Sequence, residues 1–133
     1  MFFRGALSHA FAAAAKAGFK GVECQFPYAF AKQALAELLE KNGLTHVLHN
    51  LPAGDWAAGE RGIACHPGRG AEFQEGVGRA IEYANTLGCR RLNCLAGIAP
   101  AEASEERLFA MLVDNLRFAA AETQKCGIKR LIE

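Results

Sequence analysis

The chain repeats one local pattern four times: an apolar helical segment, a glycine, an apolar residue and then a short β-rich segment. The repeated pairs are Gly18-Phe19, Gly43-Leu44, Gly88-Cys89 and Gly127-Ile128. Glycine just after a helix adopts the left-handed conformation without steric penalty, and the apolar residue that follows packs back against the helix. Each glycine therefore marks where a helix ends and a strand is about to begin.

The predicted strands follow these glycines at once and cover residues 21–26, 45–51, 91–95 and 128–133. The segments between them place apolar residues at the 3.6-residue spacing of a helix with one buried face. Because no hairpin signal joins consecutive strands, we expect parallel strands with right-handed helical crossovers. A doubly wound sheet and a (β/α)8 barrel both satisfy this order. No glycine-rich nucleotide fingerprint or P-loop is present to favour a nucleotide-binding sheet.

Composition limits the partners that such a chain can have. It has 133 residues, a formal net charge of +1, 51% hydrophobic and 22% charged residues, which is the balance of one globular domain with a real core. A nearly neutral chain has no basic surface, so we expect no nucleic-acid partner, and no apolar run approaches the ~20 residues of a membrane span. Five cysteines without a Cys-x-x-Cys pair predict free, buried thiols in a reducing cytoplasm.

The first fifteen residues have two interpretations. One early arginine and an alanine-rich stretch suggest a signal peptide. However, Leu7, Phe11 and Ala14 share one helical face, and Ser8 and His9 interrupt the apolar run. This spacing favours an amphipathic helix with His9 exposed.

Polar residues stand at the C-terminal ends of all four predicted strands. They are Glu23 and Gln25, His49 and Asn50, Asn93, and Glu133. In a barrel these ends converge on one rim, where the βα loops build the active site. Any single one of them can simply mark a strand end, but their occurrence on all four strands favours a site.

An unusually long connection, residues 52–70, follows the second predicted strand. Loops longer than ~12–15 residues are usually functional or disordered, and Trp56, Ile63 and two prolines argue for order. Trp56 is more often an anchor of its own loop than a substrate contact. Arg61 and Arg69 can each bind a carboxylate through two parallel hydrogen bonds, although a solvated surface charge is the simpler interpretation of either one.

Histidine and cysteine give only weak signals for a metal site. Cys65 and His66 are adjacent in a glycine-rich loop and lack the spacing of a metal cage. His46 and His49 lie three residues apart in a predicted strand, so strand alternation places them on opposite faces, where they cannot bind one ion together. His49 is then the better candidate for the rim.

Several segments together resemble the hydroxypyruvate isomerase family, which belongs to the xylose-isomerase-like barrels that also include endonuclease IV. The segments are 18–28, 49–69, 92–97 and 131–133, and the loop over 49–69 is the specific part of a resemblance that covers essentially the whole chain. The resemblance implies a (β/α)8 TIM barrel. Residues 1–133 would form a single partial domain, the N-terminal half with about four βα units, lacking a clear first strand and everything after the strand that ends at 133.

The resemblance also implies a reaction. Such enzymes isomerise small hydroxy-oxo acids, typically hydroxypyruvate to tartronate semialdehyde or a related sugar acid such as a 2-oxo-tetronate. Glu133 matches their metal ligand and catalytic carboxylate, with Mg²⁺, Mn²⁺ or Zn²⁺ expected in the complete protein. Proton transfer through an enediol needs a nearby carboxylate and a cation that stabilises the enediolate. We expect Arg61 or Arg69 to bind the substrate carboxylate, and Glu23 and His49 to contact its hydroxyl groups.

The family's remaining ligands, a second Glu with an Asp and a His, would lie beyond residue 133, so we expect this chain alone to be inactive. The alternative to the isomerase is therefore a truncated, non-catalytic half-barrel fragment that self-associates through its open sheet edges. An abasic-site nuclease is a third interpretation, which the weak net charge and the lack of a basic, aromatic-interleaved surface oppose.

Overall fold

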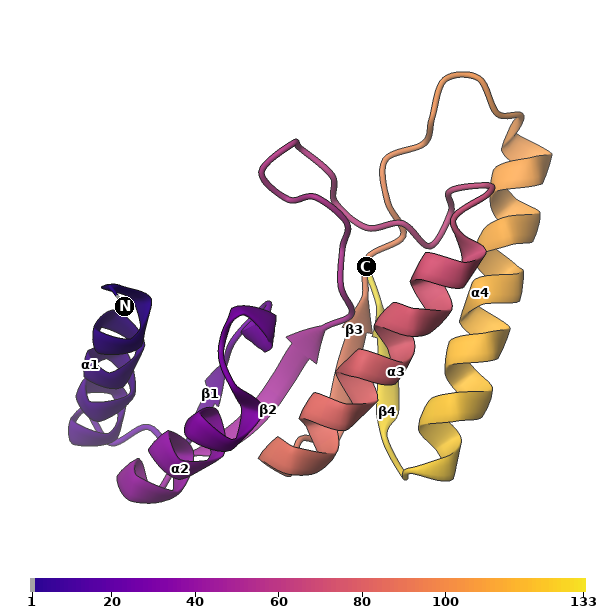
Figure 1. Ribbon diagram of the computed structural model, residues 1–133. Coiled ribbons are helices and arrows are strands. Elements are labelled where there is room, and N and C mark those ends of the chain that lie inside the picture. The colour runs from indigo at the N-terminus through magenta and orange to yellow at the C-terminus, as the bar shows by residue number, and fades with distance from the viewer. Residues whose placement is uncertain (1) are drawn as a thin grey trace.

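The computed structural model describes residues 2–133, with side chains from residue 5 on, and within that range it shows a four-stranded parallel sheet (Figure 1). The strands are β1 (Gly21–Glu23), β2 (Thr45–Asn50), β3 (Arg91–Cys94) and β4 (Lys129–Ile132). The helices are α1 (Phe2–Lys16), α2 (Lys32–Asn42), α3 (Gly70–Leu87) and α4 (Glu105–Lys125), with a short 3-10 helix, η1 (Pro27–Ala29).

Strand order decides between the two predicted architectures. The order in the sheet is β1-β2-β3-β4, the same as the order along the chain, and each helix packs against the next from α1 to α4. A doubly wound sheet instead reverses its strand order at a switch point and divides its helices between two faces. Sequential parallel strands with helices side by side form the wall of a TIM barrel. The structure therefore confirms a partial barrel.

The repeated glycines end their helices as the sequence predicts. All four have a positive φ, between 62° and 91°. After each glycine, the next N–H donates to the carbonyl five residues earlier, which is the closing bond of a Schellman motif. The pairs are Phe19 to Ala14, Leu44 to Leu39, Cys89 to Ala84 and Ile128 to Thr123. The residues at 44, 89 and 128 are buried, whereas the residue at 19 is exposed.

The first helix is amphipathic, as its apolar spacing predicts. Phe11 is buried, and Leu7 and Ala14 pack against the same cluster as α2. His9 is exposed and bonds to the Gly5 carbonyl of its own helix, 2.9 Å away. Among the described helices, none combines the length and the apolar character needed to cross a bilayer.

Two apolar clusters hold the helices on one face of the sheet. The first joins the strands to α3 and α4 and includes Val77, Ala80, Leu92, Ala119 and Ile128. The second joins α1, α2 and the end of α3 and includes Phe11, Leu35, Leu39, Tyr83 and Leu87. The sheet is less well covered at its β4 edge, where all four residues are exposed.

The first strand is shorter than predicted. It ends at Glu23 because the chain turns toward η1, which Pro27 begins. The Asn50 N–H still donates to the Gln25 carbonyl, 2.9 Å away, so Gln25 stays beside the end of β2.

Candidate functional site at the strand ends

One small pocket of about 110 Å³ lies at the C-terminal ends of the strands. Its lining comprises Leu48 and the six polar residues that the strand ends predict: Glu23, Gln25, His49, Asn50, Asn93 and Glu133. The predicted convergence of these residues is therefore confirmed. Two carboxylates and three amides meet in a space that suits a small polar molecule.

A line of hydrogen bonds connects three neighbouring strand ends. The Asn93 amide donates to the Asn50 Oδ1 at 3.2 Å and to the Glu133 Oε2 at 2.9 Å. Asn50 and Asn93 are buried and directly paired in register, so their amides occupy fixed positions. A hydrogen bond donated to a carboxylate is stronger than a neutral one and orients the group. Asn93 therefore fixes one oxygen of Glu133.

The backbone of Glu133 is fixed as well. Its N–H donates to the Cys94 carbonyl, and its carbonyl accepts from the Ala96 N–H, both at 3.0 Å. These bonds continue the ladder between β3 and β4 by one residue. The position of Glu133 thus depends on the segment that follows β3.

Tyr28 supports the rim from the side of η1. Its hydroxyl donates to the Asn50 carbonyl, and burial raises the pKa of Tyr28 far above its ordinary value. The hydroxyl therefore keeps its proton for this bond. The Arg79 guanidinium lies 5.1 Å from the centre of the Tyr28 ring and donates to the Tyr28 carbonyl at 3.0 Å.

The pocket offers oxygen donors of the kind that hard divalent cations prefer. Mg²⁺ commonly binds to one or two carboxylates and completes its shell with water and substrate oxygens. Glu133 and Glu23 provide carboxylates, and the amide oxygens provide neutral donors. The residues present therefore fit part of the shell of a divalent ion.

His46 and His49 contradict the prediction that they face opposite sides of the sheet. The His46 Nε2 and His49 Nδ1 lie 3.1 Å apart, and the two rings are stacked with centroids 5.2 Å apart. The reason is an irregularity in β2: Val22 pairs with His46, but Glu23 pairs with Leu48, so Val47 is an extra residue. An extra residue breaks the two-residue alternation of a strand and brings both rings to one side.

His49 borders the pocket, but its ring nitrogens bond elsewhere. The His49 Nε2 lies 3.1 Å from the Ala80 carbonyl on α3, and the Nδ1 faces His46. Burial lowers the pKa of His49, and burial with the neighbouring ring lowers that of His46 to about 4. Both imidazoles are therefore neutral at neutral pH. A contact between His49 and a substrate hydroxyl stays a prediction.

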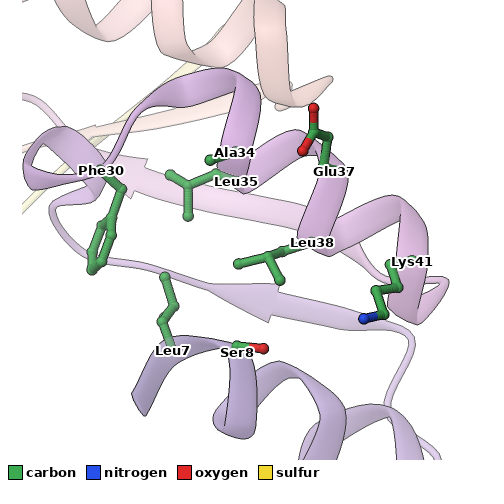
Figure 2. A pocket seen from close by; sticks show the side chains of 8 residues that line it. All are labelled: Leu7, Ser8, Phe30, Ala34, Leu35, Glu37, Leu38 and Lys41. Carbon is green, nitrogen blue, oxygen red and sulfur yellow. The ribbon is translucent and has the colours of Figure 1, made fainter. Parts of the chain in front are cut away.

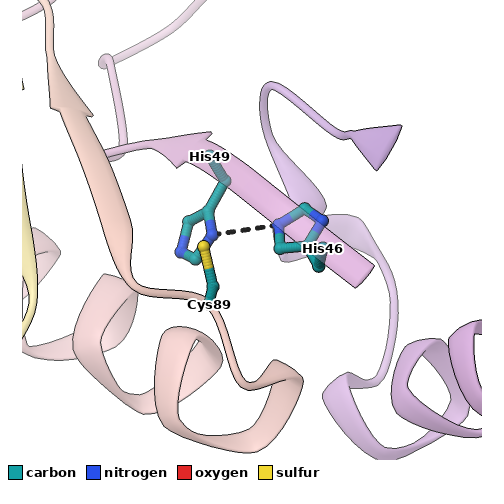
Figure 3. A group of neighbouring side chains, drawn as sticks. All are labelled: His46, His49 and Cys89. Atoms are coloured by element: carbon teal, nitrogen blue, oxygen red, sulfur yellow. Dashed lines mark hydrogen bonds between the residues drawn. The ribbon is translucent and has the colours of Figure 1, made fainter. Parts of the chain in front are cut away.

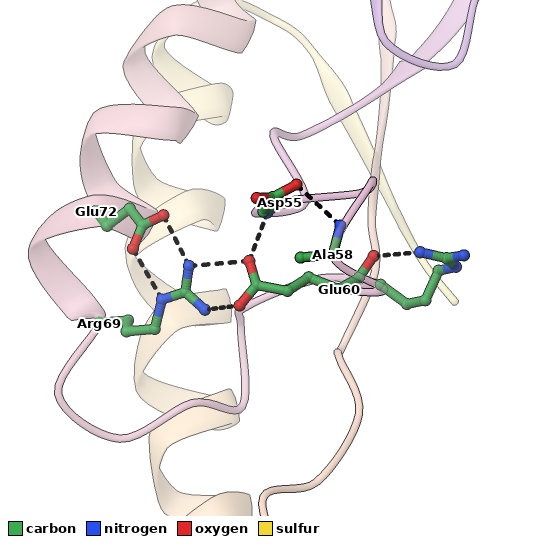
Figure 4. Close-up of polar contacts among 6 residues, drawn as sticks. Asp55, Ala58, Glu60, Arg69 and Glu72 are labelled. Carbon is green, nitrogen blue, oxygen red and sulfur yellow. Dashed lines mark hydrogen bonds and ion pairs between the residues drawn. The ribbon is translucent and has the colours of Figure 1, made fainter.

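The two loop arginines have partners within the protein and do not line the pocket. Figure 4 shows Arg69 between Glu60 and Glu72. Arg69 forms ion pairs with Glu60 and Glu72. Arg61 lies 3.9 Å from the centre of the Trp56 ring and donates to the Trp56 carbonyl at 3.1 Å. Binding of a substrate carboxylate by either arginine stays a prediction.

The long loop is ordered by contacts with the segment after β3. Ile63, Ala64 and Cys65 are buried, and the Cys65 N–H donates to the Ala96 carbonyl at 2.9 Å. A Cβ on Gly62 would lie 2.3 Å from the Leu95 carbonyl oxygen, so the two backbones touch there. Trp56 is 42% exposed and packs on Phe26, with ring centroids 4.9 Å apart.

Larger hollows lie away from the strand ends. One of about 380 Å³ lies between α1 and α2 and is lined mainly by apolar side chains (Figure 2). Another, of about 410 Å³, lies between α4 and the strands β3 and β4. Both are predominantly apolar, and neither gathers polar groups from several strands as the small pocket does.

Comparison with known proteins identifies the family. Residues 11–133 match the model of the xylose isomerase-like TIM barrel family. The chain belongs to this family. It is 55% identical over 123 residues to hydroxypyruvate isomerase from Escherichia coli (strain K12), an alignment that covers 92% of this chain and 48% of that protein. It is 49% identical to 2-oxo-tetronate isomerase from Cupriavidus necator, again over 92% of this chain and 47% of the relative.

Solved structures have the same fold as this chain. An AP endonuclease, family 2, from Brucella melitensis superposes with a TM-score of 0.90 at 42% identity, over 94% of this chain and 48% of that one. A D-allulose 3-epimerase from Methylomonas sp. superposes with a TM-score of 0.72 at 23% identity, over 94% of this chain and 44% of the epimerase, and supports the fold alone. The chain thus spans about half the length of the curated relatives that it matches.

Proposed function

We propose that this chain is the N-terminal half of an enzyme that isomerises a small hydroxy-oxo acid. Hydroxypyruvate, converted to tartronate semialdehyde, is the first candidate, and a 2-oxo-tetronate is the second. The observation that carries the proposal is Glu133, which directly follows β4 and accepts a hydrogen bond from Asn93, in a chain 55% identical to hydroxypyruvate isomerase from E. coli. The same pocket contains Glu23, the second carboxylate.

The reaction moves protons and leaves the overall oxidation level unchanged. A base removes a proton from the hydroxymethyl carbon of hydroxypyruvate, the enediol forms, and a proton is added to the neighbouring carbon while the hydroxyl proton is lost. Glu133 would take and return the carbon-bound proton. Asn93 is a positioning residue that holds its carboxylate. A divalent cation bound at this rim would stabilise negative charge on the enediolate oxygens.

The other rim residues would orient the substrate. Glu23 would accept a hydrogen bond from a substrate hydroxyl, and His49 is the second candidate for that role. Arg61 or Arg69 would bind the substrate carboxylate if the loop rearranged to release one of them from its present partners. A cytoplasmic location forms part of the proposal and is supported by five free cysteines.

The proposal can be tested with the complete reading frame that contains this chain. The purified product should convert hydroxypyruvate or a 2-oxo-tetronate, lose activity in EDTA, and regain it with Mg²⁺, Mn²⁺ or Zn²⁺. The 133-residue chain assayed in parallel should show no turnover. A complete protein that turns over no short sugar acid under any of these conditions would overturn the proposal.

The second candidate is a non-catalytic half-barrel that self-associates, and the exposed β4 edge favours it. Leu131 is 44% and Ile132 is 62% exposed, on a strand that pairs only with β3 in the sheet. Open, apolar edges are templates for pairing with another chain. Light scattering of the 133-residue chain should show a molecular mass that rises with concentration. A monomer with cooperative thermal unfolding would count against this.

An abasic-site nuclease has weaker support. The Brucella melitensis relative is named as an AP endonuclease, but this chain has a net charge of only +1. Nuclease substrates are bound through many phosphate contacts by lysine and arginine. The isomerase proposal therefore takes precedence.

A further inference from the structure

Two histidines and one cysteine meet beneath the sheet, on the side that faces α3 (Figure 3). One ring nitrogen each from His46 and His49 and the Cys89 sulfur all lie within 4.8 Å of one another. The relative exposures of the three residues are 2%, 0% and 1%. Figure 3 shows the two rings on β2 and the thiol approaching from the turn before β3.

The backbone fixes all three donors. The bulge at Val47 brings the two imidazoles to one side of β2. The Cys89 N–H closes the end of α3 by donating to the Ala84 carbonyl at 2.8 Å, and its thiol donates to the Arg91 carbonyl at 3.2 Å. The donors therefore come from two rigid segments, and only side-chain rotations are needed to bring them closer together.

The orientation of His49 suits a metal ligand. If its Nε2–H donates to the Ala80 carbonyl, its Nδ1 presents a lone pair toward His46. Metal-bound histidines usually donate their other ring N–H to a carbonyl or carboxylate in this way. The distance of 3.1 Å between the two nitrogens is close to the separation of two imidazoles on one ion, since each would bind at about 2.0–2.1 Å.

We propose that His46, His49 and Cys89 form a buried binding site for a thiophilic d10 cation, Cu⁺ or Zn²⁺. A thiolate with two imidazoles selects soft or borderline ions over Mg²⁺ and Ca²⁺. Binding replaces the thiol proton, which is released to solvent, and moves the remaining proton of His46 from Nε2 to Nδ1. With Cu⁺ the site is electrically neutral. With Zn²⁺ it keeps one positive charge and an open fourth position, so charge balance in this buried location favours Cu⁺.

This site offers different donor atoms from the pocket at the strand ends, although His49 belongs to both groups of residues. The pocket offers carboxylate and amide oxygens, among them the carboxylate of Glu133. The buried site contains no carboxylate among its three donors. The two sites share His49 alone, and the isomerase proposal, which rests on Glu133, does not depend on this inference.

The test uses the 133-residue chain, reduced and freed of metal. Titration with Cu⁺ under anaerobic conditions against a chromogenic chelator, and separately with Zn²⁺, should show one bound equivalent for at least one ion. Co²⁺ should add a thiolate-to-metal charge-transfer band and the visible bands of a low-coordinate site. The spectrum of the unchanged chain reports sulfur ligation directly, so the test does not require any variant to fold.

Variants then assign the ligands. Cys89→Ser and His46→Gln should each weaken binding at least tenfold and abolish or shift the Co²⁺ bands. Two control variants should leave the metal affinity and the Co²⁺ bands unchanged. They are Cys65→Ser, which removes another buried thiol, and Glu133→Gln, which removes the rim carboxylate. The proposal is overturned if neither Cu⁺ nor Zn²⁺ binds to the unchanged chain, or if Cys89→Ser retains full affinity while circular dichroism shows it folded.

Discussion

Gly62, in the long loop, packs directly against the backbone of the segment after β3. Replacing it with alanine should weaken the packing between these two segments. Gly62 has a φ of +113°, and a Cβ there would lie 2.3 Å from the Leu95 carbonyl oxygen and 2.7 Å from its carbon. Both are backbone atoms, so no side-chain rotation can relieve the contact. Because an ordinary carbon–oxygen contact is about 3.3–3.6 Å, the two segments must separate by roughly 1 Å.

The loss of stability in Gly62→Ala has two parts, and the same substitution at a second glycine distinguishes them. Alanine in a left-handed conformation costs roughly 1–2 kcal/mol, and forced separation of packed groups typically adds about 1–3 kcal/mol. Gly59 lies in the same loop with a φ of +97°, but a Cβ there would meet nothing within 4 Å. Gly62→Ala should therefore lower the free energy of unfolding by about 2–5 kcal/mol, and Gly59→Ala by only the first part.

Urea unfolding followed by circular dichroism measures both variants. Gly62→Ala should unfold at a clearly lower urea concentration than Gly59→Ala, with a difference of about 1–3 kcal/mol at equal slope. Gly62→Ala should also displace Glu133, because the N–H of Ala96, the residue after Leu95, donates to the Glu133 carbonyl. Equal stability of the two variants would refute the inference that the loop is held by this backbone contact.

Two further substitutions probe the loop. Hydrogen bonds from Arg69 and from the Asp55 amide lower the pKa of Glu60 from 4.5 to about 2. The ionised Glu60 therefore stabilises the folded chain above pH ~4.5, and this contribution is lost as the pH falls toward 2. The unchanged chain should therefore have a higher urea midpoint than Arg69→Ala at pH 7 and nearly the same midpoint near pH 2, and a constant difference would contradict this. Asn115 is buried and donates to the Ala64 carbonyl at 2.8 Å, so Asn115→Ala should cost about 2–3 kcal/mol in thermal or urea unfolding. The exposed Asp114→Ala should change stability by less than about 0.5 kcal/mol, and equal effects of these two would count against a role for the buried bond.

The repeated local pattern was enough to predict helices alternating with parallel strands, and the choice of a barrel over a doubly wound sheet came from the family resemblance. Gly43 and Gly88 mark helix ends through a conformational preference that acts within a few residues, so it can be read without knowing the tertiary structure. The convergence of Asn93 and Glu133 followed from parallel strands, whose C-terminal ends lie at one edge. Both inferences depend on local chemistry and on one topological rule.

The buried histidine pair could not be predicted in the same way. Strand alternation fails for His46 and His49 because Val47 is an extra residue relative to β1, and pairing between strands is not visible in one sequence. Gly21 was the available signal: a Cβ there would lie 2.7 Å from the Val47 Cγ2, and glycine in a strand often marks a bulge. Likewise, the partners of Arg69 lie in an irregular loop and at the start of a helix. In such segments the spacing of residues along the sequence does not predict which way their side chains point.

The central claim is that Glu133 transfers the proton in a hydroxy-oxo acid isomerase, and one measurement tests it most directly. The complete protein, its Glu133→Gln variant and an exposed-carboxylate control, Glu105→Gln, should be compared for turnover of hydroxypyruvate and 2-oxo-tetronates at saturating divalent metal. The account predicts that Glu133→Gln lowers kcat by at least about 10²-fold, as expected for loss of a general base, while the control retains full activity. Turnover by Glu133→Gln equal to that of the unchanged protein would contradict the account.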